Sequence, residues 1–323
     1  MGVKRVKKVL IMGGSYFIGK KIVDVMIENN YSVFTLNRGT KETNNPRITN
    51  LICDRSEENA LKVVLKDHKF DIVIDISGLD RGQAEKLYNA LNIDNLETII
   101  FLSSSAVYDV ENLMIPFIET DKMKENIYWT DYGQNKIEAE ELYTEKFENS
   151  KVKLIMLRPP YVYGENNYAQ RESFIFEHIC NDKPVLIPKS NPKLQFIYTT
   201  DLAKIILELI NQPLENINIY NVGNKQAVTA REWVESCSKA VGKPVNVIEY
   251  DYKLEGRGAR DFFPFADYDN VLEVSKINEI YCEETDFIEG LKIAYKWYLD
   301  NKDNIVFKEN VSENEKKILK GKE

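Results

Sequence analysis

The stretch Lys8–Gly19 reads KVLIMGGSYFIG. Its apolar run Val9–Met12 is typical of a central parallel strand that is covered on both faces. Gly13 and Gly14 then allow a sharp turn and a close approach of the backbone to a ligand. From Phe17 onward apolar residues recur with helical periodicity, so a helix begins at the turn and its free N–H groups form a seat for a pyrophosphate. We interpret this strand, turn and helix as a dinucleotide-binding site.

The residues expected to contact the dinucleotide here are Gly13, Ser15, Tyr16, Phe17, Ile18 and Gly19. The glycine spacing is incomplete, because Tyr16 occupies the middle position of the pattern G-x-x-G-x-x-G and its side chain can alter how closely the backbone meets the phosphates. A glycine-rich turn alone is a weak signal, and an ordinary strand, turn and helix without a ligand is the alternative. Support for a dinucleotide site must therefore come from residues further along the chain.

The composition narrows the class of protein. The chain has 323 residues, of which 43% are hydrophobic and 29% are charged, and this suits a large α/β unit with a smaller lobe. The formal net charge of −8 disfavours nucleic acid and anionic membranes as partners. The four cysteines form no C-x-x-C pair and only two histidines are present. This pattern argues against a disulfide framework and a metal site, and it indicates a cytoplasmic protein with reduced thiols.

Strands and helices alternate along the first half of the chain. Apolar runs predict strands at 9–12, 31–36, 48–52, 70–76, 97–102 and 152–157, with helices at 57–69, at 80–91 and from 131. This order predicts a doubly wound parallel sheet of the Rossmann type, with a smaller C-terminal α/β lobe. We expect a dinucleotide-binding domain at 1–165, to which 190–225 contribute. An interleaved substrate-binding lobe is expected mainly at 166–300, and a polar tail, either a frayed helix or disordered, at 301–323.

Ligands of such sheets bind at the carboxyl ends of the strands. The second strand ends in Asn37 and Arg38 without a carboxylate, which favours NADP over NAD, although an arginine in this place can also be a simple solvated residue. Asp54, after the third strand, is a candidate to bind the adenine amino group or to cap a helix. Small or hydroxylated residues end the fourth and fifth strands and extend the candidate cofactor contacts to Ser77, Gly78 and Ser103.

An ordered set of residues resembles a known family. The set comprises Gly13 to Gly19, Asp54, Ser104, Tyr132-x-x-x-Lys136, Arg158-Pro159 and Tyr163-Gly164. It is similar to the extended short-chain dehydrogenase/reductases, the NAD(P)-dependent nucleotide-sugar epimerase and dehydratase group, from Gly13 to roughly Tyr298. The resemblance implies that Tyr132 is the catalytic acid/base and that Ser104 hydrogen-bonds the reacting oxygen. It also implies that Lys136 binds the nicotinamide ribose and lowers the tyrosine pKa. A phenol with an ordinary pKa of about 10 needs such nearby positive charge to act as a base near neutral pH.

The resemblance implies further contacts as well. Tyr132, Lys136, Pro159 and Tyr161 join the candidate cofactor contacts. The candidate substrate contacts lie in the second lobe and are Tyr163, Asn166, Arg171, Arg257 and Arg260. The arginines suit the diphosphate of a nucleotide sugar, although arginines in loops are more often simply solvated. Relatives often pair through the long helices, so a homodimer is an option. Purely structural alternatives stay open: the Ser104 hydroxyl can cap the strand end, and the Tyr132 ring can pack on the helix surface.

Two departures from the family pattern shape the functional hypotheses. The dehydratases carry an Asp-Glu pair after the catalytic hydroxyl, whereas Ser105 and Ala106 follow Ser104 here, so 4,6-dehydration is disfavoured. We therefore expect an NAD(P)-dependent epimerase or ketoreductase of a nucleotide sugar, or a reductase of a smaller carbonyl compound. The glycine turn and the sequence Asn37-Arg38-Gly39 are also similar to the divergent branch of chloroplast stem-loop-binding proteins. This gives the alternative of a non-catalytic or RNA-binding protein on a dinucleotide-binding fold.

Overall fold

The computed structural model of the protein describes residues 5–40, 45–305 and 307–320. Positions 306 and 321–323 of the predicted polar tail lie outside the described residues. The chain forms two compact units. The first comprises Met1–Pro160, Thr200–Gly223 and Leu272–Cys282, and the second comprises Tyr161–Thr199, Asn224–Val271 and Glu283–Glu323. Among the described helices, none has the length and apolar character that crossing a bilayer requires.

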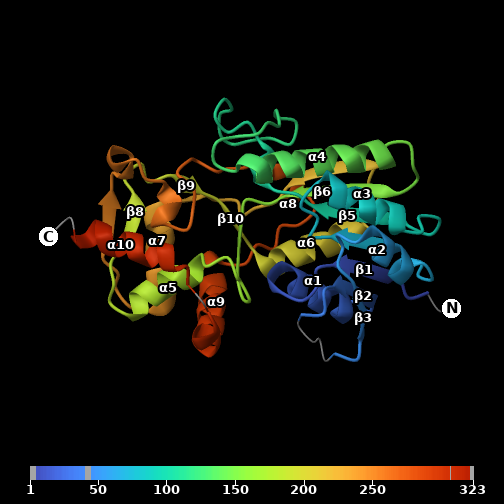
Figure 1. Ribbon diagram of the computed structural model, residues 1–323, viewed down its shortest axis with the longest axis horizontal. Helices are drawn as coiled ribbons and strands as arrows, with labels where there is room; N and C mark the ends of the chain where they lie inside the picture. Colours follow the sequence, from blue (N-terminus) through green and yellow to red (C-terminus); the bar gives the residue numbers. More distant parts are fainter. Residues whose placement is uncertain (1–4, 41–44, 306, 321–323) are drawn as a thin grey trace. The chain divides into compact units, whose positions relative to one another are not determined.

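The first unit is built on a parallel sheet of seven strands, which confirms the predicted doubly wound fold (Figure 1). In spatial order the strands are β11 (Ile217–Asn221), β6 (Lys153–Arg158), β5 (Thr98–Leu102), β4 (Ile72–Asp75), β1 (Lys8–Met12), β2 (Ser32–Asn37) and β3 (Ile48–Ile52). The order reverses direction at β1, where one crossover leads to β2 and a later one to β4. Ligands of doubly wound sheets bind at this switch point, so the glycine turn after β1 stands where a dinucleotide site is expected.

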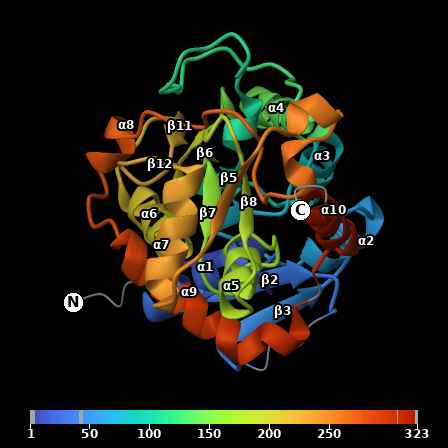
Figure 2. The same ribbon diagram turned by 90° about the vertical axis from the view of Figure 1, so that its left-hand side faces the viewer.

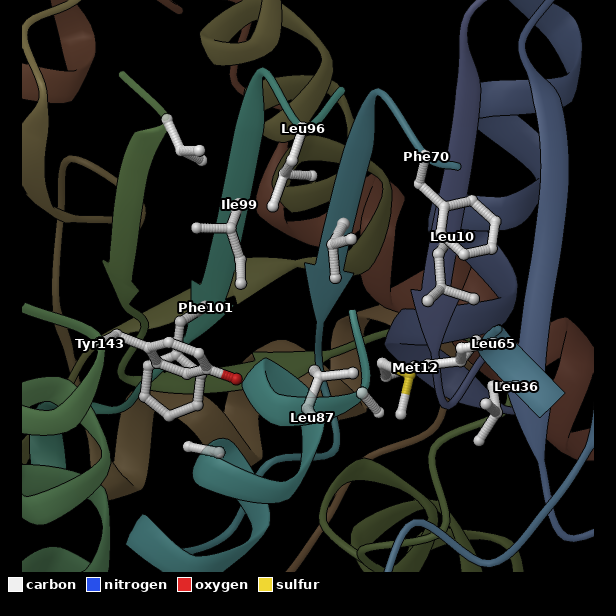
Figure 3. Close-up of a cluster of buried hydrophobic side chains, with 14 of the residues drawn as sticks. Leu10, Met12, Leu36, Leu65, Phe70, Leu87, Leu96, Ile99, Phe101 and Tyr143 are labelled. Carbon is white, nitrogen blue, oxygen red and sulfur yellow. The ribbon is translucent and has the colours of Figure 1, made fainter. Parts of the chain in front are cut away.

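Helices cover both faces of this sheet. They are α1 (Phe17–Glu28), α2 (Glu58–Leu65), α3 (Arg81–Ala90), α4 (Thr130–Phe147), α6 (Thr199–Asn211) and the short α8 (Ser275–Asn278). Side chains of α2, α3 and α4 join the strand residues Leu10, Met12 and Phe101 in one buried apolar cluster, part of which is drawn in Figure 3. Helices α1 and α6 lie on the opposite side of the sheet from α3 and α4 (Figure 1). The central strands are mainly apolar because both of their faces are buried.

The second unit combines short strand pairs with helices. The pairs are β7 (Tyr161–Tyr163) with β10 (Phe196–Tyr198), β9 (Lys193–Leu194) with β12 (Val228–Thr229), and β8 (Val185–Pro188) with β13 (Val247–Tyr250). The helices are α5 (Glu172–Cys180), α7 (Ala230–Val241), α9 (Phe287–Asn301) and α10 (Glu309–Lys320), and all four are visible in Figure 2. Aromatic side chains form its core, where the rings of Phe196 and Trp233 stack with centroids 4.0 Å apart.

Two segments toward the C-terminal end of the described chain contribute to the second unit. The segment 255–265 contributes the buried rings of Phe262, Phe263 and Phe265. The polar tail contains the helix α10, whose buried Glu315 meets the imidazole of His178 at 3.1 Å. In both segments a few apolar or paired residues stand among polar ones, and their burial depends on tertiary partners that local composition does not reveal.

Candidate active site

The glycine turn after β1 is tightly packed. Gly13 has a φ of +96°, a conformation that L side chains rarely adopt. A Cβ atom on Gly14 would lie 2.6 Å from Cγ2 of Thr35, and one on Gly19 would lie 2.0 Å from the carbonyl oxygen of Gly13. Each of the three positions therefore requires glycine for a different steric reason. Gly19 lets α1 approach the turn closely enough for the helix N-terminus to face a ligand there.

Two buried hydroxyl groups near the strand ends suit a polar ligand. The Oγ atoms of Ser15, in the turn after β1, and of Ser103, directly after β5, are buried and have no hydrogen-bond partner within the described part of the chain. Buried hydroxyls are normally hydrogen-bonded. Together with the glycine turn and the helix N-terminus, these side chains fit the polar groups of a dinucleotide. Of the other predicted contacts in the turn, Tyr16 is exposed, Ile18 is half-buried and Phe17 is buried.

The ends of β2 and β3 carry the residues expected at the adenosine. Asn37 Oδ1 accepts a hydrogen bond from the N–H of Gly39 at 2.8 Å, and Arg38 is exposed. Asp54 Oδ1 accepts one from the N–H of Ser56 at 2.9 Å. This bond holds the pKa of Asp54 below its usual value, with a smaller contribution from the positive charge of Arg38. The two strand ends thus present a cation and an ionised carboxylate at one edge of the sheet.

Lys136 links α4 to the ends of two central strands. Its side chain is buried, and its Nζ donates hydrogen bonds to the carbonyl oxygens of Gly78 at 2.6 Å and Leu102 at 2.8 Å. The ammonium also lies 4.7 Å from the centroid of the Phe101 ring. Burial lowers the pKa of Lys136 to about 8. Because an ammonium has three donors and these carbonyls use two, one N–H can serve a ligand.

Ser104 and Tyr132 lie on neighbouring segments of the same unit. Ser104 precedes the 3-10 turn η1 (Ser105–Val107), and its Oγ accepts a hydrogen bond from the N–H of Ala106 at 3.2 Å. This turn packs on the start of α4, where a Cβ on Gly133 would lie 2.6 Å from the carbonyl oxygen of Ala106. Tyr132 immediately precedes Gly133 and is 38% exposed. The structure therefore places Ser104, the first turn of α4 with the partly exposed Tyr132, and the Lys136 ammonium near the carboxyl end of β5.

Sequence reasoning missed a charged group beneath this site. Asp75, the last residue of β4, is fully buried and forms an ion pair with Arg55, with Nη1–Oδ1 and Nη2–Oδ2 distances of 2.5 and 3.0 Å. The hydroxyl of Tyr143 donates to Asp75 Oδ2 at 2.7 Å. The signal in the sequence was a carboxylate at the end of an apolar strand run, which by itself does not name its partners.

The predicted substrate residues all lie in the second unit. The guanidinium of Arg171 donates to the carbonyl oxygen of Val162 at 2.9 Å and lies 5.3 Å from the centroid of the Tyr161 ring. Burial raises the pKa of Tyr161 to about 12, against the opposing charges of Arg171 and Arg260. Arg257 Nε donates to Glu255 Oε2 at 3.1 Å. The positive charges of Arg171 and Arg260 therefore both act on the region around Tyr161.

The remaining predicted contacts have different surroundings. Tyr163 has no exposed surface and packs against Trp233 and Phe287, so its place in the aromatic core argues for a packing role instead of the expected contact with substrate. Asn166 is half-buried, with a φ of +62°. In the first unit, the carbonyl oxygen of Pro159 accepts a hydrogen bond from the N–H of Ser105. Pro159 thereby borders the turn that follows Ser104.

The part of the chain that builds this site matches a protein-family model. The model described as the NAD dependent epimerase/dehydratase family matches residues 9–223, more than half of the chain. The chain belongs to this family. The match includes all predicted catalytic and cofactor residues, and it confirms the predicted class of an NAD(P)-dependent epimerase or reductase of the short-chain dehydrogenase type. Arg257 and Arg260 lie beyond it.

Individual relatives and solved structures are similar to this chain over most of its length. The chloroplast stem-loop binding protein of 41 kDa b from Arabidopsis thaliana is 28% identical over 307 residues, which cover 90% of this chain and 78% of the relative. The UDP-N-acetylglucosamine 4-epimerase from Methanobrevibacter ruminantium has a TM-score of 0.76 at 21% identity, covering 92% of this chain and 100% of that one. The UDP-glucose 4-epimerase from Thermus thermophilus, solved with NAD, has a TM-score of 0.73 at 18% identity, covering 90% and 99%. At these identities the solved structures establish the shared fold.

Proposed function

We propose that this protein is an NAD(P)-dependent epimerase or ketoreductase that acts on a hydroxyl or keto carbon of a nucleotide sugar. The observation that carries the proposal is the anchoring of Lys136 to the carbonyl oxygens of Gly78 and Leu102, at 2.6 and 2.8 Å, on the same helix as Tyr132. A buried cation thus lies one helical turn along α4 from a tyrosine that is 38% exposed. It stands at the carboxyl ends of β4 and β5, where ligands of doubly wound sheets bind.

Ser104, Tyr132 and Lys136 have separate roles in the proposed proton transfer. A bound nicotinamide supplies the hydride acceptor or donor. The Ser104 hydroxyl donates a hydrogen bond to the sugar oxygen and fixes its position. In the oxidative direction the phenolate of Tyr132 takes the proton of the sugar hydroxyl, and in the reductive direction the phenol returns it to the carbonyl oxygen. The positive charge of Lys136, one helical turn further along α4, favours the phenolate.

Cations of the second unit suit a nucleotide sugar. The proposed partners of its diphosphate are Arg171, Arg257 and Arg260. A guanidinium group can donate two parallel hydrogen bonds to the oxygens of one phosphate. The pairing of Arg257 with Glu255 means that a phosphate would have to compete for this cation. The two solved structures named above are of UDP-sugar epimerases, which supports the same substrate class here.

The adenosine end of the site favours NADP. β2 ends in Asn37 and Arg38, and Asn37 is engaged with the N–H of Gly39. A carboxylate in this place binds the 2′-hydroxyl of NAD, whereas an arginine accommodates the 2′-phosphate of NADP. The exposed Arg38 is the proposed phosphate partner.

The test is the substitution Tyr132→Phe. It removes the proton carrier and keeps the ring, so we expect turnover to fall by about 100-fold or more while dinucleotide affinity is unchanged. Native mass spectrometry of the purified protein identifies the dinucleotide and the sugar nucleotide that bind, and turnover is then measured with them. Tyr88→Phe on α3, where the ring packs against Phe147, is the matched control and should keep full activity. Unchanged turnover in Tyr132→Phe would reject the acid/base assignment.

RNA binding, the alternative raised by the sequence, has less physical support. Affinity for RNA rests largely on phosphate contacts by cations, and the chain has a net charge of −8. The name of the Arabidopsis relative describes that protein, and this chain retains the serine, tyrosine and lysine that an RNA-binding role does not need. We expect no RNA retention in a filter-binding assay at low salt.

A further inference from the structure

We propose that Asp75, held by Arg55 and Tyr143, is a positioning residue that sets the place and the proton affinity of Lys136. The proposal deepens the function proposed above and rests on it. None of the three residues belongs to the serine, tyrosine and lysine set, and each comes from a different segment: Asp75 ends β4, Arg55 follows β3 and Tyr143 lies on α4.

The carboxylate of Asp75 is fully occupied by donors. Besides both Nη atoms of Arg55 and the hydroxyl of Tyr143, the N–H of Gly78 donates to Asp75 Oδ1 at 2.9 Å. Arg55 Nη1 also donates to Ser77 Oγ at 2.8 Å. A buried carboxylate is costly unless it is paired and hydrogen-bonded, so this number of donors fixes its position and keeps it ionised.

The turn after β4 connects this carboxylate to the catalytic lysine. Gly78 donates its N–H to Asp75 and accepts a hydrogen bond from Lys136 Nζ at 2.6 Å with its carbonyl oxygen. A Cβ on Gly78 would lie 2.4 Å from Asp75 Oδ2, so the turn wraps closely around the carboxylate. The acceptor that holds Lys136 is therefore oriented by the bond that Asp75 makes to the same residue.

Tyr143 fastens α4 to the same carboxylate. It lies seven residues after Lys136, about two helical turns, so both side chains point from one face of α4. Its ring packs on Phe101 with centroids 5.1 Å apart, and Figure 3 shows the two side chains side by side in the buried cluster. Burial keeps the pKa of Tyr143 well above its ordinary value, so the hydroxyl remains a donor. The helix that carries Tyr132 is thus attached to the end of β4 at two points.

The charges around Lys136 define the expected effect. Burial is the main cause of its lowered pKa; Asp75 raises this pKa, Arg55 lowers it, and Glu140, which is paired with Arg158, raises it. Replacing Asp75 by asparagine removes a favourable negative charge and leaves the positive charge of Arg55 unbalanced. The loss of this negative charge, while the positive charge of Arg55 stays in place, shifts the pKa of Lys136 downward.

The experiment titrates Lys136 by NMR in the full-length protein labelled with ¹³C-lysine, without added substrate, with Lys136→Met used to assign its signal. In Asp75→Asn we expect the Lys136 midpoint to fall by about one pH unit. Asp71→Asn is the matched control, because Asp71 is a buried aspartate at the opposite end of the same strand segment and is paired with Arg5. It should leave the Lys136 titration unchanged. An unchanged midpoint in folded Asp75→Asn would overturn the proposal.

If Asp75→Asn does not fold, a second variant tests the positioning role of the network. Tyr143→Phe keeps the ring packing and removes only the hydroxyl that fastens α4. We expect kcat to fall about tenfold with KM for the sugar unchanged, because Tyr132 and Lys136 are less well oriented. Unaltered kcat would contradict the positioning role. The titration needs no turnover, so a shifted Lys136 signal in a protein without epimerase or reductase activity would reject the proposed function and retain the network.

Discussion

The ammonium nitrogen of Lys136 lies 2.6 Å from the carbonyl oxygen of Gly78. This contact joins α4 to the loop after β4, and the side chain that carries the positive charge is buried. Burying a charged amine is costly, and the two backbone carbonyls offset only part of that cost. The consequence is a lysine whose protonation changes near the upper end of the physiological pH range.

The first prediction concerns stability against pH. The pKa of Lys136 falls from 10.5 to about 8 on folding, with burial as the main cause. Below about pH 8 the folded protein carries the full cost of the buried ammonium. Between about pH 8 and 10.5 the unfolded chain keeps a proton that the folded protein has lost, so stability rises with pH in this window. The difference of about 2.5 pH units corresponds to about 3 kcal/mol at 1.36 kcal/mol per unit.

Urea unfolding of wild type and Lys136→Met at pH 7.5 and 10.5 measures this effect. The free energy of unfolding of the wild type should gain about 3 kcal/mol relative to the variant across the range. Lys62→Met replaces an exposed lysine on α2 and should show no such relative gain. Parallel pH curves for wild type and Lys136→Met would contradict the buried, perturbed lysine.

The second prediction concerns the glycine turn. In Gly19→Ala the new Cβ would lie 2.0 Å from the carbonyl oxygen of Gly13, so α1 must move away from the turn. We expect the free energy of unfolding to fall by about 1–3 kcal/mol, as in other overpacked sites, and dinucleotide affinity to weaken with it. Calorimetric titration with NAD and NADP measures the affinity. Gly82→Ala is the control, since on α3 the nearest atom to a Cβ is Asp80 Oδ1 at 3.3 Å. Equal affinity in Gly19→Ala and wild type would show that close packing of α1 is not required.

The fold could be predicted from the sequence because its signals are local. The run Val9–Met12 and the glycines after it specify a buried strand and a tight turn within a few residues, and the helix that follows repeats its apolar positions at the period of one face. The catalytic set Ser104, Tyr132 and Lys136 was found by resemblance, and its roles remain predictions.

The missed features depend on contacts between distant segments. Arg55 lies 20 residues from Asp75, and Tyr143 lies 68 residues from it. Each residue taken alone has an ordinary local explanation: a charge after a strand, an aspartate at a strand end, an aromatic on a helix. The same reason explains Phe262, which stands in no predicted helix or strand and is buried through its partners in the second unit.

The third prediction concerns cofactor choice. The wild type should bind NADP more tightly than NAD, because Arg38 can pair with the 2′-phosphate and no carboxylate ends β2. Arg38→Ala should weaken NADP binding by about tenfold, the loss of one charge-assisted hydrogen bond, and leave NAD affinity unchanged. Titration calorimetry with both dinucleotides gives the two ratios. Tighter binding of NAD to the wild type would reverse the assignment.

The fourth prediction concerns the buried ion pair that joins α4 to β6. Glu140 and Arg158 are each about 2% exposed, with an Nη2–Oε2 distance of 2.6 Å and an Nε–Oε1 distance of 3.0 Å. Glu140→Gln leaves the Arg158 guanidinium buried without its counter-charge, so the free energy of unfolding should fall by about 3–5 kcal/mol in urea denaturation. The double variant Glu140→Gln/Arg158→Met removes the stranded charge and should recover part of the loss. Glu58→Gln, which breaks an exposed pair with Lys62 on α2, should cause no measurable change. If Glu140→Gln proves as harmless as Glu58→Gln, water or another carboxylate must reach Arg158, and the packing of α4 against β6 cannot be as close as the structure has it.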